Sequence, residues 1–588
     1  MTHPLTHPVH SFHIPVMGTG FTVDTPLKVA RYGISSVVSL VDDILLEQMR
    51  GLVCRREGRG FEAVPSDAED ARADRITRYL DLLAEVVDRQ IEQVRGAVFE
   101  TGSEITRYFE MLPGSPLRAA YERMLEATGP ARARLQEELR GAVVAGGIDV
   151  NIMTKLDRVR LRHGLPLGPA FTDAMSALRG YARSRLRSSV VLSAGVNRRL
   201  FAYLAEFDDF FPDRGGDFRK RIVLKVSDFR SAQVQARLLA QKGLWVSEFR
   251  VESGLNCGGH AFGGTGTLLG PVLEDFRRER ARLSAQLRES WASALASLGR
   301  AVPATSPEQR VTVQGGIGTA EENELLLRHY GVDGTGWGTP FLMVPEAVNI
   351  DPIHLDRLCK AGEDDIHLSD SSPLGVPFWS LRNSESELLR LQRIDDGHPG
   401  SACPKGFLVS NTEFTKVPIC TASRAYQRRK LQDIDDAGLD AATRAQQTDD
   451  VVVKACICHD LAGGATLPSG IDPDARTAVC CGPNAAYFTR SASLREMIDH
   501  IYGRGRLPLA EQRPHMLLKE LSLHLDRLRE AASDRQDQGA EAAMRVRENL
   551  LAGIEHYREL AAQALAGARA SFLERLEYLQ SELTAHKS

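Results

Sequence analysis

Residues 311–346 read VTVQGGIGTAEENELLLRHYGVDGTGWGTPFLMVPE. The stretch runs from a β-branched strand through GGIGT into an amphipathic helix, and then through a second short strand at residues 334–337 into the loop GWGT. This order is typical of two consecutive βα units that close an α/β barrel. Glycine leaves the backbone amides and a helix N-terminus open to an anion. Because the phosphate site of such barrels commonly follows strands 7 and 8, the stretch predicts a phosphate cradle.

Six further runs of strand-like sequence come before this stretch. Each is short and rich in β-branched or aromatic residues, and helical stretches separate them, which is typical of parallel strands in an α/β fold. With the two strands above they make eight, the number that closes a barrel. We therefore predict an α/β fold, a (β/α)8 TIM barrel formed by residues 1–40 and 148–345. The six runs are residues 14–20, 36–40, 148–153, 189–193, 221–226 and 244–251.

Three stretches lie outside the expected barrel. Residues 41–147 show helical spacing only and predict a helical insertion between strands 2 and 3, which serves either as extra packing or as a lid that excludes water. Residues 346–510 predict a cysteine-rich loop region, because Pro, Gly and Ser punctuate them. Residues 511–588 predict C-terminal helices with one apolar stripe, which would pack on the same chain or on a second copy in a homo-oligomer.

Composition narrows the classes of partner. The formal net charge is −4, so a nucleic acid would need a local basic groove, which the sequence does not show. No apolar run of about 18 residues predicts a membrane helix. The first residues lack a basic region followed by an apolar core, so we expect no signal peptide and a cytoplasmic protein.

Cysteine is unevenly distributed. Three cysteines are scattered, whereas six fall within residues 403–481. Without a secretory signal, such clustering indicates metal or redox chemistry before disulfides. Four thiolates suffice for an iron–sulfur cluster of the 4Fe-4S type; zinc and unligated redox thiols are the alternatives. The candidate ligands are Cys403, Cys420, Cys456 and Cys480, with Cys458 as their main rival.

A histidine follows the sixth expected strand. Residues 254–260 read GLNCGGH, so Gly258 and Gly259 let the backbone pass close to a flat ligand and present His260 at the barrel mouth. An imidazole there is a candidate for proton transfer. The alternative is a histidine that only makes a hydrogen bond within its loop.

Five motifs occur in one order between residue 14 and about residue 383. They are the strand and TP helix start at 14–26, VNI at 150–152, NCGGH at 256–260, GGI at 315–317 and GVDGTGWGTPF at 331–341, and SLRN follows at 380–383. In that order they resemble the nitronate monooxygenase group of FMN-dependent barrels. This group includes FMN-using enoyl-ACP reductases and the enoyl-reductase partners of polyunsaturated fatty acid synthases.

The resemblance implies an FMN-binding barrel with His260 as its active-site histidine. Asn256 and Cys257 stand where the family has Glu and Ala, and Pro340 replaces its arginine, so the pocket chemistry and substrate differ. From its position at the end of the fifth strand, Lys225 either enters the site as a cation near the reduced flavin or only extends along the barrel with its charge in water. The residues expected to bind FMN are Gly18, Gly20, Asn151, Lys225, Gly258, Gly259, Gly315, Gly316, Gly318, Gly336, Gly338 and Thr339.

The sequence thus predicts an FMN-dependent oxidoreductase, either a reductase or a monooxygenase, for a small-molecule substrate. An iron–sulfur cluster would pass electrons to the flavin from a donor such as NAD(P)H or a ferredoxin-like protein. Two alternatives belong to other classes: a non-catalytic interaction protein that binds metal or flavin, and an RNA-modifying flavoprotein, against which the net charge argues.

Overall fold

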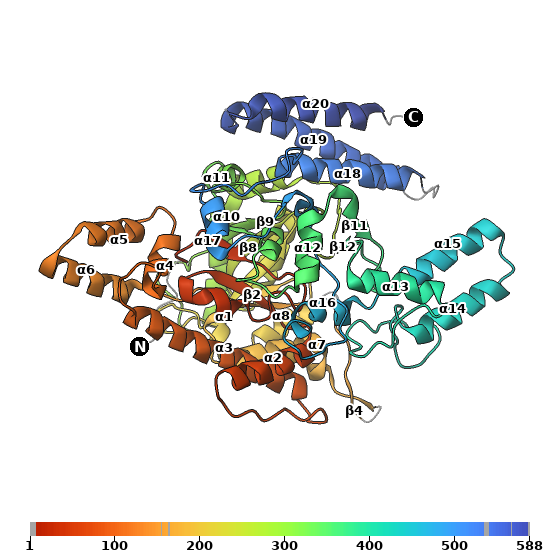
Figure 1. Cartoon of the computed structure of the whole chain (residues 1–588), viewed down its shortest axis with the longest axis horizontal. Coiled ribbons are helices and arrows are strands. Elements are labelled where there is room, and N and C mark those ends of the chain that lie inside the picture. The colour runs from red at the N-terminus through yellow and green to blue at the C-terminus, as the bar shows by residue number, and fades with distance from the viewer. Residues whose placement is uncertain are drawn as a thin grey trace.

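The computed structural model describes residues 8–153, 156–162, 165–193, 195–533, 540–565 and 567–585. Eight parallel strands close into a barrel in the order β1-β10-β9-β8-β7-β6-β3-β2, with helices around it (Figure 1). The predicted (β/α)8 fold is confirmed, although residues 1–7 of the predicted barrel range lie outside the described residues. The strands are β1 (Phe12–Ile14), β2 (Ser35–Ser39), β3 (Ile148–Ile152), β6 (Ser188–Leu192), β7 (Lys220–Val226), β8 (Val246–Glu252), β9 (Arg310–Gln314) and β10 (Gly334–Gly336).

The first strand ends earlier than the sequence suggested. Pro15 has no backbone N–H to give to a ladder, and Gly18 turns the chain with a φ of +57°. The chain therefore leaves the barrel after Ile14 and forms a loop over the mouth before helix α1 (Thr25–Val29) begins at the predicted Thr-Pro step.

Strand register places the polar strand ends at one rim. Glu252 of β8 lies beside Gln314 of β9, and Gln314 lies beside Gly336 of β10. Across the barrel, Ser39 of β2 lies beside Asn151 of β3. Since the strands are parallel, the loops that follow them meet at this same end.

Helices cover the outside of the barrel. They are α7 (Asp173–Arg183), α8 (Arg198–Leu204), α9 (Phe229–Ala240), α10 (Leu269–Ser297) and α11 (Ala320–Arg328). The strand that follows α11 leads into a short 3-10 turn, Thr339–Met343. The next α-helix begins only at Pro352.

The insertion between β2 and β3 is helical, as expected. Its helices are α2 (Asp43–Arg56), α3 (Ala71–Gly96), α4 (Glu104–Met111), α5 (Pro116–Glu126) and α6 (Gly129–Ala142). Helix α3 packs on α7 so closely that a Cβ at Gly180 would lie 2.9 Å from Ile76 Cβ. The insertion thus lies on the flank of the barrel, and α5 and α6 extend away from it (Figure 1).

The region predicted as cysteine-rich loops contains a hairpin and six α-helices. Its helices have 8 to 13 residues, so each offers only two to four turns of periodicity in the sequence. Helices α14 and α15 form a hairpin that projects from the body (Figure 1). The elements are α12 (Pro352–Lys360), β11 (Ile366–Ser369), β12 (Phe378–Leu381), α13 (Glu385–Asp395), α14 (Arg424–Asp436), α15 (Ala441–Val452), α16 (Ile457–Thr466) and α17 (Leu494–Ile501).

Three helices end the chain: α18 (Met516–Ser533), α19 (Ala540–Ala564) and α20 (Arg569–Ala585). The three helices pack on one another, and α18 and α19 also pack on α10. This packing buries the predicted apolar stripe, for instance Ile554, Tyr557 and Leu576. The stripe is therefore satisfied within the chain and gives no argument for a second copy. Among the described helices, none combines the length and apolar character needed to cross a membrane.

Candidate active site

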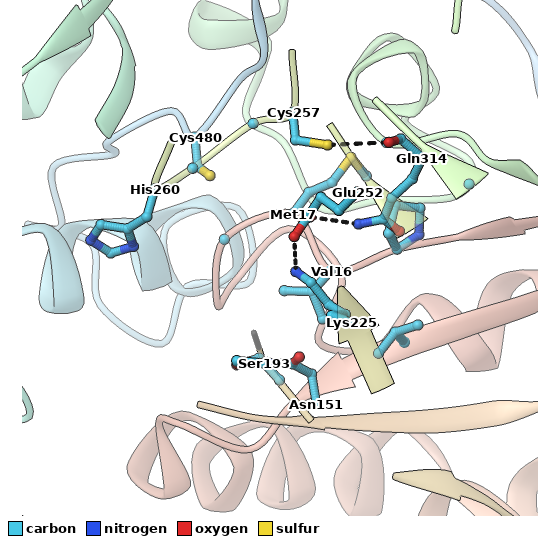
Figure 2. A pocket seen from close by; sticks show the side chains of 18 of the residues that line it. Val16, Met17, Asn151, Ser193, Lys225, Glu252, Cys257, His260, Gln314 and Cys480 are labelled. Atoms are coloured by element: carbon cyan, nitrogen blue, oxygen red, sulfur yellow. Dashed lines mark hydrogen bonds and ion pairs between the residues drawn. The ribbon is translucent and has the colours of Figure 1, made fainter. Parts of the chain in front are cut away.

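A pocket opens at the carboxyl ends of the barrel strands (Figure 2). Its lining comes from the loops after β1, β8, β9 and β10 and from strand ends on the opposite side. Most of the residues predicted for the site line it: Gly18, Asn151, Lys225, Gly258, Gly259, His260, Gly315, Gly316, Gly336, Gly338 and Thr339. The sequence therefore located the rim of this pocket, although it named few of its polar side chains.

Gly20 does not line the pocket, contrary to the prediction. Its N–H donates to the carbonyl of Leu461 at 3.1 Å, and a Cβ there would lie 2.6 Å from that oxygen. The position needs glycine because the loop after β1 packs directly on α16. Gly20 is thus a packing residue behind the site.

Gly318 also lies outside the pocket, because the start of α11 is already capped. Its N–H donates to Glu322 Oε2 at 2.8 Å, and Thr319 and Glu322 form a capping box. Arg513 covers this carboxylate with bonds of 2.9 and 2.7 Å. The negative charge at this helix N-terminus is therefore the protein's own, and the predicted phosphate position at Gly318 is wrong.

Gly315 and Gly316 do border the pocket, and their conformation requires glycine. Their φ angles are +126° and +74°, and a Cβ on Gly316 would lie 2.0 Å from Asn256 Nδ2. Asn256 is fixed by donating this amide to the carbonyl of Met516 at 3.0 Å. The loop after β9 thus reaches the pocket as bare backbone.

Polar side chains that the sequence reasoning missed form one side of the pocket. Lys225 Nζ pairs with Glu252 Oε2 at 2.8 Å, and Gln314 Nε2 donates to Glu252 Oε1 at 2.7 Å (Figure 2). Glu252 and Gln314 are polar residues at the ends of neighbouring strands, a signal that could have identified both. Lys225 therefore lines the pocket as the ion-pair partner of Glu252.

Two oxygen atoms at the pocket have no hydrogen-bond partner in the described part of the chain. They are Thr19 Oγ1 and Asn256 Oδ1, both buried. A buried polar atom without a partner costs about 1–3 kcal/mol, so native structures rarely leave two together. Their chemistry fits a polar ligand that donates hydrogen bonds.

His260 is held at the opposite side of the pocket. Its Nε2 lies 2.7 Å from Ser372 Oγ, and its ring contacts Phe378 edge-on, with centroids 5.1 Å apart. Cys480 lies beside it: a Cβ on Gly259 would be 3.2 Å from Cys480 Sγ. Figure 2 shows this pair across from Cys257, Glu252 and Gln314. His260 and the Lys225–Glu252 pair thus line opposite sides of one pocket.

Cys257 stays protonated at physiological pH. Burial, together with the nearby charge of Glu252, raises the pKa of its thiol well above the ordinary value. Its Sγ donates to the carbonyl of Gln314 at 3.5 Å. Cys257 is therefore a weak donor in the rim and not a thiolate.

A strap that the sequence did not reveal crosses the rim at residues 480–484. The N–H of Gly482 donates to Thr339 Oγ1 at 3.1 Å, and Asn484 Nδ2 donates to the carbonyl of Ile317 at 2.9 Å. The strap therefore joins the loops after β9 and β10, and Asn484 lines the pocket.

The cover of the pocket comes from residues 346–510. Phe378, Phe407, Leu408, Ile457 and Leu461 supply its apolar side. Of the helical insertion, only Val41 lines the pocket among the described residues. The role of a lid, one of the two considered for the insertion, thus falls to the cysteine-rich region.

Four of the candidate cysteines gather beside this cover. Cys420 hydrogen-bonds to Cys403, Cys458 hydrogen-bonds to Cys456, and the two pairs lie close enough for their charges to interact. Cys458 also lines the pocket, whereas Cys480 reaches it from the strap. Among the described residues, no three His, Cys, Asp or Glu side chains are arranged around a point to hold a single metal ion.

Glu520 of α18 supports the loop that carries His260. It is buried and accepts hydrogen bonds from Ser253 Oγ at 2.5 Å and from the N–H of Leu269 at 2.8 Å. Ser253 Oγ in turn accepts from the N–H of Asn256 at 3.1 Å. Burial raises the pKa of Glu520 to about 7, although these bonds act to lower it. Burial therefore favours the protonated, uncharged form of Glu520 at this position.

We expect Glu520→Gln to flatten the pH dependence of stability. A carboxyl with a raised pKa contributes stability that is complete below its unfolded pKa and is lost as the pH rises through about 7. At about 1.4 kcal/mol per pKa unit, the variant should exceed the parent at pH 8 by about 3 kcal/mol in free energy of unfolding. Urea unfolding at pH 5 and pH 8 measures this.

Glu577→Gln on the exposed face of α20 is the matched control and should leave the pH dependence unchanged. Equal pH slopes for the parent and Glu520→Gln would show that Glu520 ionises in the fold at its ordinary pKa.

Comparison with known proteins adds little to this description. No family model and no curated protein sequence matches the chain. Among solved structures, the enoyl reductase domain of MlnA from the macrolactin biosynthesis cluster of Bacillus amyloliquefaciens is similar at 13% sequence identity, over 75% of this chain and 88% of that domain, with a TM-score of 0.29. A likeness this weak carries no argument about function. The assignment of the barrel rests on the strand order described above.

Proposed function

We propose that this chain is an FMN-dependent oxidoreductase that acts on a small molecule. The observation that carries the proposal is the pocket at the barrel mouth, where glycine backbone after β9 and β10 lies together with buried oxygens that have no partner among the described residues. Bare backbone suits a phosphate, and unpartnered acceptors suit a flavin ring that carries an N–H donor. This combination also agrees with the family resemblance of the motifs.

The residues that would hold FMN are those that line the pocket. Gly315, Gly316, Gly338 and Thr339 would receive the phosphate, without Gly318. Gly18, Asn151, Lys225, Gly258, Gly259 and Gly336 would lie along the rest of the cofactor, with Gln314 as an acceptor. When bound, FMN supplies the hydride or electron chemistry.

The chain itself would position a proton and exclude water. His260, whose Nε2 is hydrogen-bonded to Ser372, would give or take a proton at the mouth. The apolar cover of Phe378, Phe407 and Leu461 would keep water from the reacting atoms. This set of residues serves a reductase and a monooxygenase equally, so the proposal includes both.

An accessory iron–sulfur cluster belongs to the same proposal. Cysteine thiols gather next to the pocket, and Cys458 lines it. A flavin can pass electrons singly, so a one-electron centre beside it would suit a ferredoxin-like donor, whereas NAD(P)H, a two-electron donor, would give its hydride to the flavin itself.

The test of the flavin assignment is cofactor release and rebinding. The purified protein is denatured, the released flavin is identified by mass, and FMN is titrated back into the stripped protein. Tight binding of one FMN is the expected result. A chain that releases no FMN and binds none would overturn the proposal.

Gly338→Asp should weaken FMN binding at least about 10-fold, or about 1.4 kcal/mol. Its carboxylate would stand where the phosphate is proposed to bind. A Cβ there would lie 3.3 Å from Pro15 Cγ and 3.7 Å from Met17 Cγ, both side-chain atoms, so the fold should persist. Gly338→Asn has the same size without the charge and is the control. Equal FMN affinity of the two variants would move the phosphate away from Gly338.

A further inference from the structure

Four thiols from three separate segments of the chain meet at the edge of the pocket. Cys403 and Cys420 lie in the loops between α13 and α14, and Cys456 and Cys458 lie at the start of α16. The thiol of Cys420 donates to Cys403 and that of Cys458 donates to Cys456. The charges of Cys403 and Cys420 also raise the pKa of the Cys458 thiol, so the two pairs lie next to each other. All four are free thiols in this structure.

Backbone hydrogen bonds fix this meeting point. Ser401 donates its N–H to the carbonyl of Ala422 at 3.0 Å and accepts from the N–H of Arg424 at 2.8 Å, which places the segment before Cys403 beside the segment that follows Cys420. Ser401 also hydrogen-bonds to the thiol of Cys456. One serine thus joins all three segments.

The backbone at Cys403 is strained. Its φ of +51° is the one positive value of a non-glycine residue among the described residues. Such a conformation is unfavourable for a residue with a Cβ and persists when its surroundings hold it in place. Here it turns the thiol toward Cys420 in spite of that cost.

On this basis we propose that Cys403, Cys420, Cys456 and Cys458 hold an iron–sulfur cluster at the edge of the pocket, with Cys480 left as a thiol of the pocket itself. The inference deepens the proposed function and rests on it for the flavin as electron partner. It replaces the sequence-based preference for Cys480 by Cys458.

The number and arrangement of the thiols favour a cluster over the alternatives. A redox dithiol needs two cysteines, and here four converge. A single ion such as zinc needs its ligands around one point, and the described residues offer no such group. A 4Fe-4S cluster takes one thiolate at each of four irons, so its ligands surround a larger body.

The location suits electron transfer. Cys458 lines the pocket together with Ile457 and Leu461, whereas Cys403 is partly exposed. The set thus extends from the surface to the pocket. The hairpin of α14 and α15, which projects beside it (Figure 1), is the segment between Cys420 and Cys456.

Cys480 occupies a different place. Its Sγ lies against Gly259, next to His260, and its neighbour Cys481 is fully buried. The strap of residues 480–484 is tied to Thr339 and Ile317 of the barrel. These bonds hold Cys480 to the barrel loops.

The experiment compares Cys458→Ser with Cys480→Ser in the full chain, purified without oxygen and reconstituted with ferrous iron and sulfide. Iron and acid-labile sulfide are measured per chain, together with visible absorbance that dithionite bleaches, and FMN is measured separately. The parent and Cys480→Ser should each hold about four irons and four sulfides. Cys458→Ser should lose most of both. Circular dichroism confirms that each variant folds, and Cys420→Ser serves as a second ligand variant should Cys458→Ser not fold.

Two results would overturn the assignment. One is loss of iron in Cys480→Ser with iron retained in Cys458→Ser. The other is a parent protein that takes up no iron and sulfide under these conditions and forms a disulfide between these cysteines on mild oxidation. The flavin measurement keeps the two proposals apart, because a parent that holds the cluster without binding FMN would support the ligand set and reject the flavin.

Discussion

Replacing Arg513 by alanine is expected to lower the free energy of unfolding by about 3–5 kcal/mol. Arg513 donates to both carboxylate oxygens of Glu322, and both side chains are buried, with exposed fractions of 7% and 3%. Burial alone would raise the pKa of Glu322, yet the charge and hydrogen bonds of Arg513 hold it below its ordinary value. Removing the guanidinium would leave an uncompensated charge in the interior.

The same arginine also positions the glycine loop of the pocket. Its Nη2 donates to the carbonyl of Gly316 at 2.9 Å and its Nε to Asn484 Oδ1 at 3.0 Å. We therefore expect Arg513→Ala to weaken FMN binding as well as stability, because the loop after β9 and the strap lose a shared anchor.

Urea unfolding of a double-mutant cycle measures the effect. The variants are Arg513→Ala, Glu322→Gln and the double variant, and the double variant should be less destabilised than the sum of the two single variants because it leaves no buried charge. Arg506→Ala is the control. Arg506 is exposed and pairs with Glu321, which lies in α11 next to Glu322, so its loss should lower the free energy of unfolding by less than about 1 kcal/mol. A similarly small cost for Arg513→Ala would show that water reaches Glu322 in solution.

The ion pair between Arg513 and Glu322 illustrates what the sequence could and could not predict. Thr319 and Glu322 have the spacing of a capping box, so the N-terminal cap of α11 could be predicted from the local sequence. The glycines of GGIGT were instead interpreted as an anion site along their whole length. Arg513 contacts this cap from a position 191 residues further along the sequence. A contact over such a separation cannot be predicted from a local sequence pattern.

The barrel strands were predictable for the opposite reason. Buried parallel strands are rich in β-branched and other apolar residues, so β7 and β9, with seven and five residues, are recognised from their own sequence, whereas β1 and β10 have three residues each. The pocket rim followed, since parallel strands bring their carboxyl ends together. Glu252 and Gln314 belong to that rim but lack a motif, and their role emerged from strand register.

The cysteine set was only partly predictable. Clustering in the sequence pointed to the region where four of the thiols lie near one another, but it did not show that Cys458 and Cys480 lie in different places. That distinction depends on where α16 begins and on the bonds of the 480–484 strap to the barrel. Both are tertiary features.

Replacing His260 by alanine is expected to slow substrate turnover by about 10²–10⁴-fold, the usual contribution of a general acid or base. The His260 ring lines the pocket at its mouth and is hydrogen-bonded to Ser372, whereas the residues proposed to hold the FMN phosphate lie in the loops after β9 and β10. FMN content should therefore remain that of the parent. The measurement is flavin reoxidation under two conditions, by an α,β-unsaturated thioester without oxygen and by an alkyl nitronate in air.

Ser372→Ala is the matched control for this prediction. It removes the hydroxyl 2.7 Å from His260 Nε2 and leaves the imidazole in place against Phe378, so the loss of turnover should be about 10-fold or less. If His260 acts by proton transfer, its alanine variant should also lose a limb of the pH–rate profile that Ser372→Ala retains. Unchanged turnover in His260→Ala, with whichever probe the parent accepts, would limit His260 to a hydrogen bond within its loop and leave Glu252 with Lys225 as the remaining pair able to handle a proton at the mouth.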